Sequence, residues 1–324
     1  MTSIADPVGA PAEERSESTV TVVLALVANA LIAVAKSVAA MITGSASMLA
    51  ESAHSWADTG NELLLLVADR RSRRPADARH PLGFGKDAYV WSLFAALGLF
   101  AIGAGVSITH GVQELIHPEA GTDYLIAYVV LAISFVLEAI SFRQAFRQTR
   151  AEAKEANRDL ITHALGTSDP TVRAVFAEDA AALAGLVIAG TCIAIHQLTG
   201  WARADAIGSI LVGLLLAVVA MILVSRNVRF LIGEEVDGAI RDAALTALLE
   251  HPEVERVTYL RMEFLGPRQV MLIASIDLVG NASESDTADT LRTLRARIET
   301  EHPKIRRAFL SLATADEPPI VPAR

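Results

Sequence analysis

Residues 45–67 read SASMLAESAHSWADTGNELLLLV, and this stretch decides the fold because it is long enough to cross a bilayer as a helix yet is charged. Its ionisable side chains are Glu51, His54, Asp58 and Glu62. At about 100° per residue they fall, together with Ser55, on one narrow face of a helix. An ionisable group deep in hydrocarbon costs on the order of 2.5–3.5 kcal/mol. The stripe therefore needs a watery cavity, a counter-charge or a metal ion opposite it.

Within the stripe, His54 and Asp58 are four residues apart, so both side chains can reach one ion from adjacent turns of a helix. Two structural interpretations compete with a metal site. The stripe could be the polar face of an interfacial helix, or part of a buried polar network between helices. Lys36, inside the preceding apolar run, either pairs with a carboxylate of the stripe or extends outward to the interface.

Composition indicates a membrane protein. The 324 residues are 52% hydrophobic with a mean hydropathy of +0.40, which predicts several spans plus a smaller soluble piece. The net charge of −9 argues against nucleic acid as a partner. A lone cysteine, Cys192, excludes disulfide scaffolds and multi-cysteine metal sites within one chain. Residues 1–18 lack the basic region of a signal peptide and are predicted to be a disordered leader.

Six candidate spans follow from the apolar runs, at about residues 20–42, 45–67, 90–109, 124–142, 172–195 and 205–224. Basic side chains gather in segments 69–86 and 143–173, which are expected as loops, while the alternate loops carry at most Arg203. The positive-inside rule then places both segments, and both termini, in the cytoplasm. The sequence thus predicts a transport domain over residues 19–229 in the plasma (inner) membrane.

After Arg229 the pattern becomes that of a small soluble domain, residues 230–314. It predicts a helix over 237–250, strands over 254–264 and 269–278, a helix over 285–301 and a strand over 305–313. The fold class expected is therefore a mainly α membrane protein with six transmembrane helices and a C-terminal α+β domain of αββαβ order, ferredoxin-like and cytoplasmic. The Pro-rich tail, residues 315–324, is predicted to be disordered.

Four local motifs, in their order along the chain, resemble those of the cation diffusion facilitator (cation efflux) family, in particular its zinc-transporter-like subgroup. They are the TGSAS run at 43–47 with the stripe that follows it, RHPLGFGK at 79–86, EDAA at 178–181 and DAIGS at 205–209. The resemblance covers nearly the whole chain after Ser18. It implies a transporter that forms a homodimer through its C-terminal domain and has no resident cofactor.

The resemblance also implies one metal site near the middle of the membrane, with two ligands from the second span and two from the fifth. His54 and Asp58 match the first pair, and Asp179 matches one member of the second. The other member falls on Val175, which cannot bind a metal. The substitutes considered are Glu178, Glu51 and Glu138. A structural role competes with ligation at each of these three.

The family's loop site, built from an Asp and two His, is matched here by Asp77 and His80, with Phe84 in place of the second His. This site is expected to be weak or absent, and a solvated Arg-rich loop is the favoured alternative. In the soluble domain, Thr258 and Ala274 stand where some family members carry metal-binding His. No high-occupancy metal site is predicted there.

The chemistry leads to one main functional hypothesis. An imidazole with several carboxylates suits Zn²⁺ and also admits Mn²⁺, Fe²⁺ or Co²⁺. Because these ligands bind metal only when deprotonated, protons and metal compete, which favours proton-coupled antiport with alternating access. The alternatives are an intramembrane metalloenzyme, without any H-E-x-x-H pair in its favour, and a membrane-anchored scaffold. Ligand type alone fixes neither the metal nor the proton-to-metal ratio.

Overall fold

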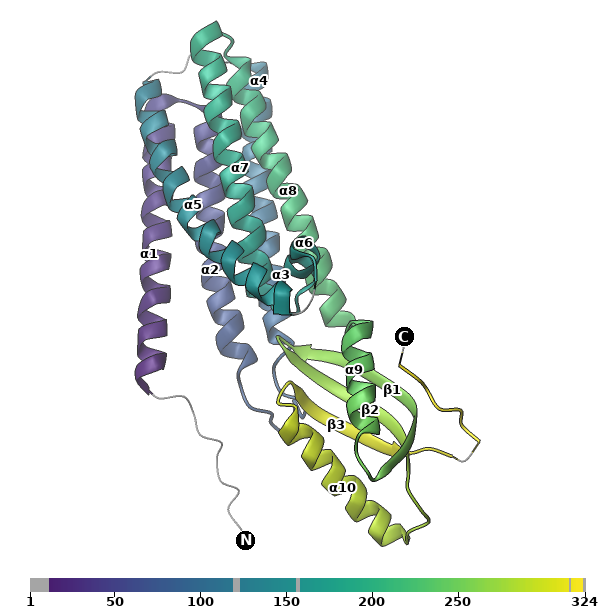
Figure 1. Ribbon diagram of the computed structural model, residues 1–324. Coiled ribbons are helices and arrows are strands. Elements are labelled where there is room, and N and C mark those ends of the chain that lie inside the picture. The colour runs from purple at the N-terminus through teal and green to yellow at the C-terminus, as the bar shows by residue number, and fades with distance from the viewer. Residues whose placement is uncertain (1–11, 119–122, 156–157, 315, 323–324) are drawn as a thin grey trace. The chain divides into compact units, whose positions relative to one another are not determined.

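The structure is a computed structural model that describes residues 12–118, 123–155, 158–314 and 316–322. Most of the predicted leader, residues 1–11, lies outside this range. Helices dominate the chain, and one small sheet lies near its C-terminus (Figure 1). The membrane-length helical runs are α1 (Ala12–Thr43), α2 (Ala46–Ser72), α3 (Asp87–Gly98) continued by η1 (Leu99–Ala104) and α4 (Gly105–Ile116), α5 (Tyr124–Glu155), α7 (Pro170–Thr199) and α8 (Arg203–Ile232).

Each of the six predicted spans corresponds to one of these runs. Four of them, residues 87–116, α5, α7 and α8, are long and apolar enough to cross a membrane. Helix α2 carries the charged stripe instead, and the apolar part found in α1, Asn29–Thr43, is shorter. Six spans therefore remain a prediction, of which four have support from length and composition.

One sequence expectation is wrong in the segment 143–173, which was expected to be a loop but is largely helical. Helix α5 continues to Glu155, and a short helix, α6 (Leu160–Gly166), follows it. The reason lies in residues 143–155, RQAFRQTRAEAKE, which contain good helix formers and neither Gly nor Pro. Asp159 caps α6 by accepting hydrogen bonds from the backbone N–H groups of Ile161 and Thr162 at 3.1 and 3.2 Å.

Residue contacts divide the chain into two compact units. The first comprises Met1–Leu64, Ala95–Gln148 and Val175–Met221, and the second comprises Leu65–Phe94, Thr149–Ala174 and Ile222–Arg324. The predicted soluble domain thus lies in the second unit together with one end of several long helices. The domain boundaries drawn from sequence remain a prediction.

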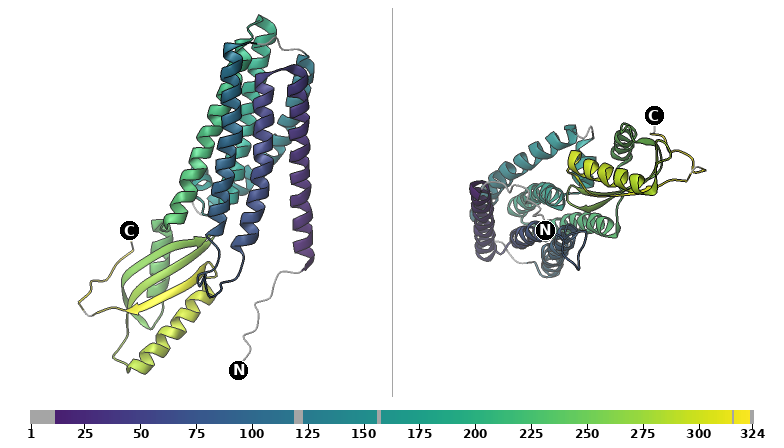
Figure 2. Two further views of the ribbon diagram at one scale, coloured as in Figure 1. Left: turned by 180° about the vertical axis from the view of Figure 1, so that it is seen from behind. Right: turned by 90° about the horizontal axis from the view of Figure 1, so that it is seen from below.

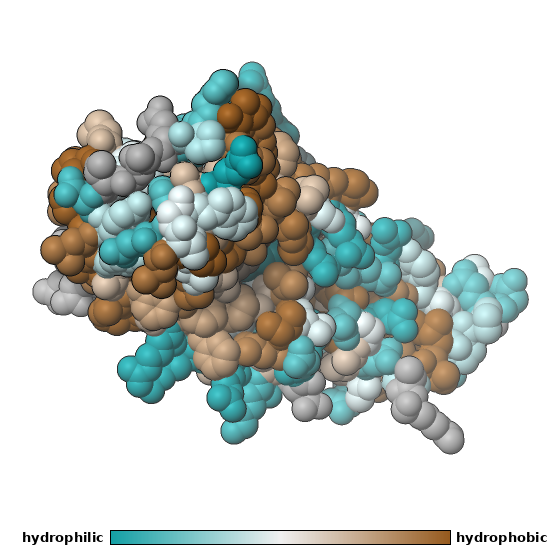
Figure 3. Space-filling view, turned by 90° about the horizontal axis from the view of Figure 1, so that it is seen from above, coloured by the Kyte–Doolittle hydropathy of each residue, from teal (hydrophilic) through white to brown (hydrophobic). Residues whose placement is uncertain are grey.

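Close backbone approach and an apolar exterior characterise the first unit. A Cβ on Gly111 would lie 2.9 Å from the backbone oxygen of Ala206, and one on Gly213 would lie 3.0 Å from the backbone N of Ile108, so α4 and α8 touch through their glycines. Apolar side chains cover much of the surface in Figure 3, and Met41 and Leu125 are 76% and 75% exposed. Such a surface suits contact with lipid.

The described part of the C-terminal region has the predicted element order. Helix α9 (Gly238–Leu249), strands β1 (Val254–Gly266) and β2 (Gln269–Leu278), helix α10 (Glu284–Glu301) and strand β3 (Ile305–Leu312) follow one another. The sheet order is β1-β2-β3, with an antiparallel β1–β2 pair and a parallel β2–β3 pair (Figure 2). The ferredoxin-like classification stays a prediction.

A single apolar core joins both helices to one face of this sheet. Leu245 of α9 and Leu294 of α10 belong to the same buried cluster as Leu272, Ala274 and Ile276 of β2. Alternation along the strands therefore directs one face into the core, as the sequence predicts. On the opposite face of the sheet, Tyr259 and Phe309 are each 47% exposed.

Both ends of the described chain differ from the disorder expected there. Residues 12–18 belong to α1. In the tail, the N–H of Ile320 donates to the Val257 carbonyl at 2.9 Å, and the Thr258 hydroxyl donates to Glu317 at 2.7 Å. Ile320 also packs against the core of the C-terminal domain, so the tail is anchored to β1 at Glu317 and Ile320.

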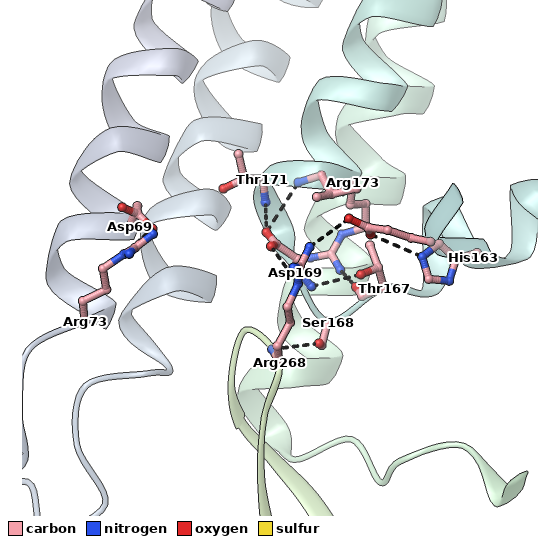
Figure 4. Close-up of polar contacts among 11 residues, drawn as sticks. Asp69, Arg73, His163, Thr167, Ser168, Asp169, Thr171, Arg173 and Arg268 are labelled. Carbon is pink, nitrogen blue, oxygen red and sulfur yellow. Dashed lines mark hydrogen bonds and ion pairs between the residues drawn. The ribbon is translucent and has the colours of Figure 1, made fainter. Parts of the chain in front are cut away.

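In the second unit, the β1–β2 turn is fixed to helix ends by polar contacts (Figure 4). The Arg268 guanidinium donates to Glu152 at 3.0 Å and lies 3.6 Å from Asp169, while its backbone N–H donates to Ser168 at 3.1 Å. Beside this turn, Gly266 meets Gly85 so closely that a Cβ on Gly266 would lie 2.6 Å from the Gly85 Cα. The turn is therefore part of the packing at the helix ends.

Candidate metal-transport site

The position of the charged stripe is set at the start of α2. The carboxylate of Asp205, at the start of α8, accepts hydrogen bonds from the backbone N–H groups of Ala46 and Ser47 at 2.7 and 3.3 Å. A negative charge there satisfies the free N–H groups and complements the helix dipole. The DAIGS motif thus has a structural role, which the sequence analysis missed because capping between distant helices leaves no local signal.

His54 and Asp58 lie together, as their spacing predicts. His54 Nε2 is 3.4 Å from Asp58 Oδ2, and the His54 side chain is 1% exposed. Both ring nitrogens of His54 and the second oxygen of Asp58 are buried without hydrogen-bond partners among the described residues. Because a buried polar atom without a partner is costly, this pair is suited to a ligand that accepts electron pairs, such as a metal ion.

Glu51 has a different partner. The Lys36 ammonium donates to Glu51 Oε2 at 3.0 Å, and both side chains are 0% exposed. Of the two alternatives for Lys36, the structure therefore shows pairing with the stripe. The other oxygen, Glu51 Oε1, has no hydrogen-bond partner in the described part of the chain and lies 2.7 Å from where a Cβ on Gly185 would be. Glu51 contacts α1 and α7 at once.

Glu178 and Asp179 are adjacent in α7 but point to different helices, as the roughly 100° turn between neighbouring residues requires. The Asn61 amide of α2 donates to Glu178, which is 7% exposed. The Ser141 hydroxyl of α5 donates to Asp179 at 2.7 Å. Of the two, Glu178 therefore faces the stripe directly, one turn of helix beyond Val175.

Asn61 is a residue that the sequence analysis missed. It lies seven residues after His54 and three after Asp58, so it continues the polar face of α2 by another turn. Its side-chain oxygen is buried without a hydrogen-bond partner among the described residues, while its amide holds Glu178. The i, i+4, i+7 spacing from His54 was the signal available in the sequence.

Carboxylates outnumber cations around the stripe. Asp58 lies within electrostatic reach of Glu178, Glu138 and Asp179, and Glu62, which accepts a hydrogen bond from Asn29 at 3.1 Å, interacts with Glu178 and Asp179. Lys36 also acts on Asp58, but its ammonium is already bound to Glu51. Such an excess of acidic groups, once ionised, would be neutralised by a dication.

These side chains do not yet form a coordination shell. Within the described ranges, no three His, Cys, Asp or Glu side chains lie close enough together to hold a metal ion. The contacts explain this: Glu51 is bound to Lys36, Glu178 to Asn61 and Asp179 to Ser141. The structure therefore brings His54, Asp58 and Glu178 to one region and leaves Asp179 turned toward α5.

The predicted loop pair is present but exposed. His80 Nδ1 lies 3.0 Å from Asp77 Oδ1, and the two side chains are 50% and 49% exposed. The backbone N–H of His80, its ring and the N–H of Arg79 lower the pKa of Asp77, so the carboxylate is ionised and already partnered. Phe84 lies against the His80 ring, with centroids 4.2 Å apart, where the family's second His would be.

In the C-terminal domain, Thr258 and Ala274 both have structural roles. Thr258 donates to Glu317, and Ala274 is fully buried in the core. Neither side chain offers a ligand that a divalent metal prefers.

A bundle of long helices with a buried His and carboxylate stripe defines a multi-pass membrane protein with an ionic site between its helices. The family model of the cation efflux transmembrane domain matches residues 22–232, so the chain belongs to the cation efflux family. This finding confirms the resemblance of its motifs. It also argues against the metalloenzyme hypothesis, because the metal ion is the transported substrate of a cation efflux protein.

Three relatives illustrate the range of the family. The mitochondrial proton-coupled zinc antiporter SLC30A9 of Xenopus laevis is 36% identical over 260 residues, which cover 80% of this chain and 46% of that protein. Metal tolerance protein C4 of Arabidopsis thaliana is 36% identical over 233 residues, 72% of this chain and 51% of the relative. Magnetosome protein MamB of Paramagnetospirillum magneticum is 24% identical over 282 residues, 86% and 89% of the two chains. The chain spans about half the length of the first two.

Proposed function

We propose that this protein exports Zn²⁺ from the cytoplasm in exchange for protons, by alternating access. The observation that carries the proposal is the group of unpartnered buried atoms on His54, Asp58 and Glu178. A dication would satisfy these three side chains once Glu178 has moved away from Asn61. The name of the zinc antiporter that matches 80% of this chain supports the choice of metal and of protons.

We propose His54, Asp58 and Glu178 as the central ligands, with Asp179 as the fourth. Glu178 replaces the ligand missing at Val175, because it is the acidic side chain of α7 that reaches α2. Binding requires Glu178 to leave Asn61 and Asp179 to leave Ser141. Glu51 remains bound to Lys36 and does not coordinate the metal ion itself.

Proton coupling follows from the same ligands. Imidazole and carboxylates bind metal only after releasing their protons, so an inward proton gradient displaces the metal on the far side of the membrane. Replacing a His by Glu178 makes the ligand set harder, which widens the range of metals toward Mn²⁺, Fe²⁺ and Co²⁺. The test should therefore compare Zn²⁺, Mn²⁺, Fe²⁺ and Co²⁺.

We further propose six spans with both termini cytoplasmic, in the plasma (inner) membrane, and a homodimer formed through the C-terminal domain. The basic segments 69–86 and 143–173 support the orientation. The exposed aromatic side chains of Tyr259 and Phe309 on the open sheet face support self-association there. Light scattering of the purified protein would test the dimer, and Tyr259→Glu should weaken it.

The central test is metal-driven proton flux in proteoliposomes. Asp58→Asn and Glu178→Gln should abolish the flux, because each removes a charge from the shell. Asp179→Asn should reduce it less if Glu178 is the main ligand from α7. The matched control is Asp69→Asn on the same helix α2, where the carboxylate is exposed and bound to Arg73. Wild-type flux in Asp58→Asn would reject the proposal.

A further inference from the structure

A pocket in the second unit is lined by four arginines and has no part in the transport site. Its volume is about 410 Å³, counting the space open to solvent. Arg73 and Arg74, just after α2, line one part, and Arg306 and Arg307 of β3 line another. The positive-inside rule accounts for arginines beside a span, but not for the pair on the soluble domain.

The pair on β3 is placed by an irregularity in the strand. Val270 is opposite Ile305, but Met271 is opposite Arg307, so Arg306 is an extra residue in the ladder. As a result Ile305 and Ala308 are buried while both arginines between them are exposed. A regular strand would direct neighbouring side chains to opposite faces.

Most of this positive charge is uncompensated. Arg73 is bound to Asp69 at 2.8 Å (Figure 4). In the ranges that the structure describes, no carboxylate lies within ion-pair distance of Arg74, Arg306 or Arg307. Uncompensated guanidinium groups that line one pocket repel one another unless an anion joins them.

Phe84 connects this pocket to the departure from the family pattern. The Arg74 guanidinium lies over the Phe84 ring, 4.6 Å from its centroid. Phe84 stands where the resemblance places a metal-binding His, so the side chain that removes a cation ligand also supports an arginine. The loss of the His and the contact of Phe84 with Arg74 both favour an anion over a cation in this pocket.

We propose that this pocket binds a phosphate-bearing anion, held by Arg74, Arg306 and Arg307. Guanidinium groups bind phosphate oxygens through paired, charge-assisted hydrogen bonds, and Gln269 on the pocket wall adds an amide donor. The phosphate could be free in solution or belong to a lipid headgroup. The proposal does not depend on the transported metal.

The test compares two charge-matched variants of the full-length protein. Arg306→Gln with Arg307→Gln removes the strand pair, and the control, Arg292→Gln with Arg295→Gln, removes two exposed charges on α10 outside the pocket. One arm measures inorganic phosphate binding by ³¹P NMR line broadening at constant ionic strength. The other counts retained lipids by native mass spectrometry after reconstitution in phosphatidylcholine, alone or equimolar with phosphatidylglycerol.

Binding should weaken about tenfold or more in the pocket variant and stay unchanged in the control. Loss in the phosphate arm alone assigns a soluble ligand, and loss in the lipid arm alone assigns a headgroup. Absence of binding in both arms, or equal loss in pocket and control variants, overturns the proposal. If the pocket variant does not fold, Phe84→Leu, which removes the ring under Arg74, should weaken binding in the same arm.

Discussion

The buried pair of Lys36 and Glu51 gives the sharpest quantitative prediction. Lys36→Met keeps an unbranched side chain, one heavy atom shorter, but leaves Glu51 without its cation, and one Glu51 oxygen already has no hydrogen-bond partner among the described residues. Removing one partner of a buried ion pair costs about 3–5 kcal/mol. Replacing both charges, as Lys36→Met with Glu51→Gln, should recover most of this loss, because no buried charge is then left alone.

The measurement is the free energy of unfolding in mixed micelles, titrated with dodecyl sulfate, for the two single variants and the double variant. Lys154→Met, at an exposed position on α5, is the control for losing a lysine and should change little. The coupling energy from the cycle should be of the order of 2 kcal/mol or more. Additive losses in the double variant would refute the reasoning, because they would mean that the two charges do not depend on each other.

Two further predictions concern close backbone approach. Gly185→Ala should lower stability by about 1–3 kcal/mol, because the new methyl group would lie 2.7 Å from Glu51 Oε1 and the bond from Lys36 keeps this carboxylate from moving aside. Thermal unfolding in detergent should show a lower midpoint. Gly266→Ala should lower the midpoint as well, since its Cβ would lie 2.6 Å from the Gly85 Cα and neither backbone can rotate away. Gly238→Ala, which meets nothing within 4 Å, is the control for both, and a midpoint shift equal to it would contradict either prediction.

Periodicity predicted the elements of the fold well, because it reports which face of a helix or strand is buried. The strand at 269–278 has the predicted bounds, and the helix expected at 285–301 begins one residue earlier. Side-chain contacts between distant segments were harder to predict. Asp205 caps the start of α2 by accepting from Ala46, 159 residues away, and no local sequence pattern predicts such a contact.

The candidate site was predicted in part. The spacing of His54 and Asp58 was sufficient to place them together, and the charge of Lys36 was sufficient to raise pairing as an alternative. Which of Glu178 and Asp179 faces α2 could not be decided, since that depends on the rotation of α7 about its axis. Asn61 was missed because the candidate ligands were selected by charge, and an amide side chain is uncharged.

The contact between the β1–β2 turn and the helix ends has a practical consequence for dissecting the molecule. The Phe230 ring, near the end of α8, stacks on Tyr89 and makes an edge-on contact with Phe264 of β1. Truncating the chain after α8 would remove Phe264 and expose the Phe230 ring. It would also remove Arg268, the hydrogen-bond donor to Glu152. A truncated protein would thus expose an apolar surface that is buried in the full-length chain. Any loss of activity or stability could then come from that exposed surface as much as from the missing domain.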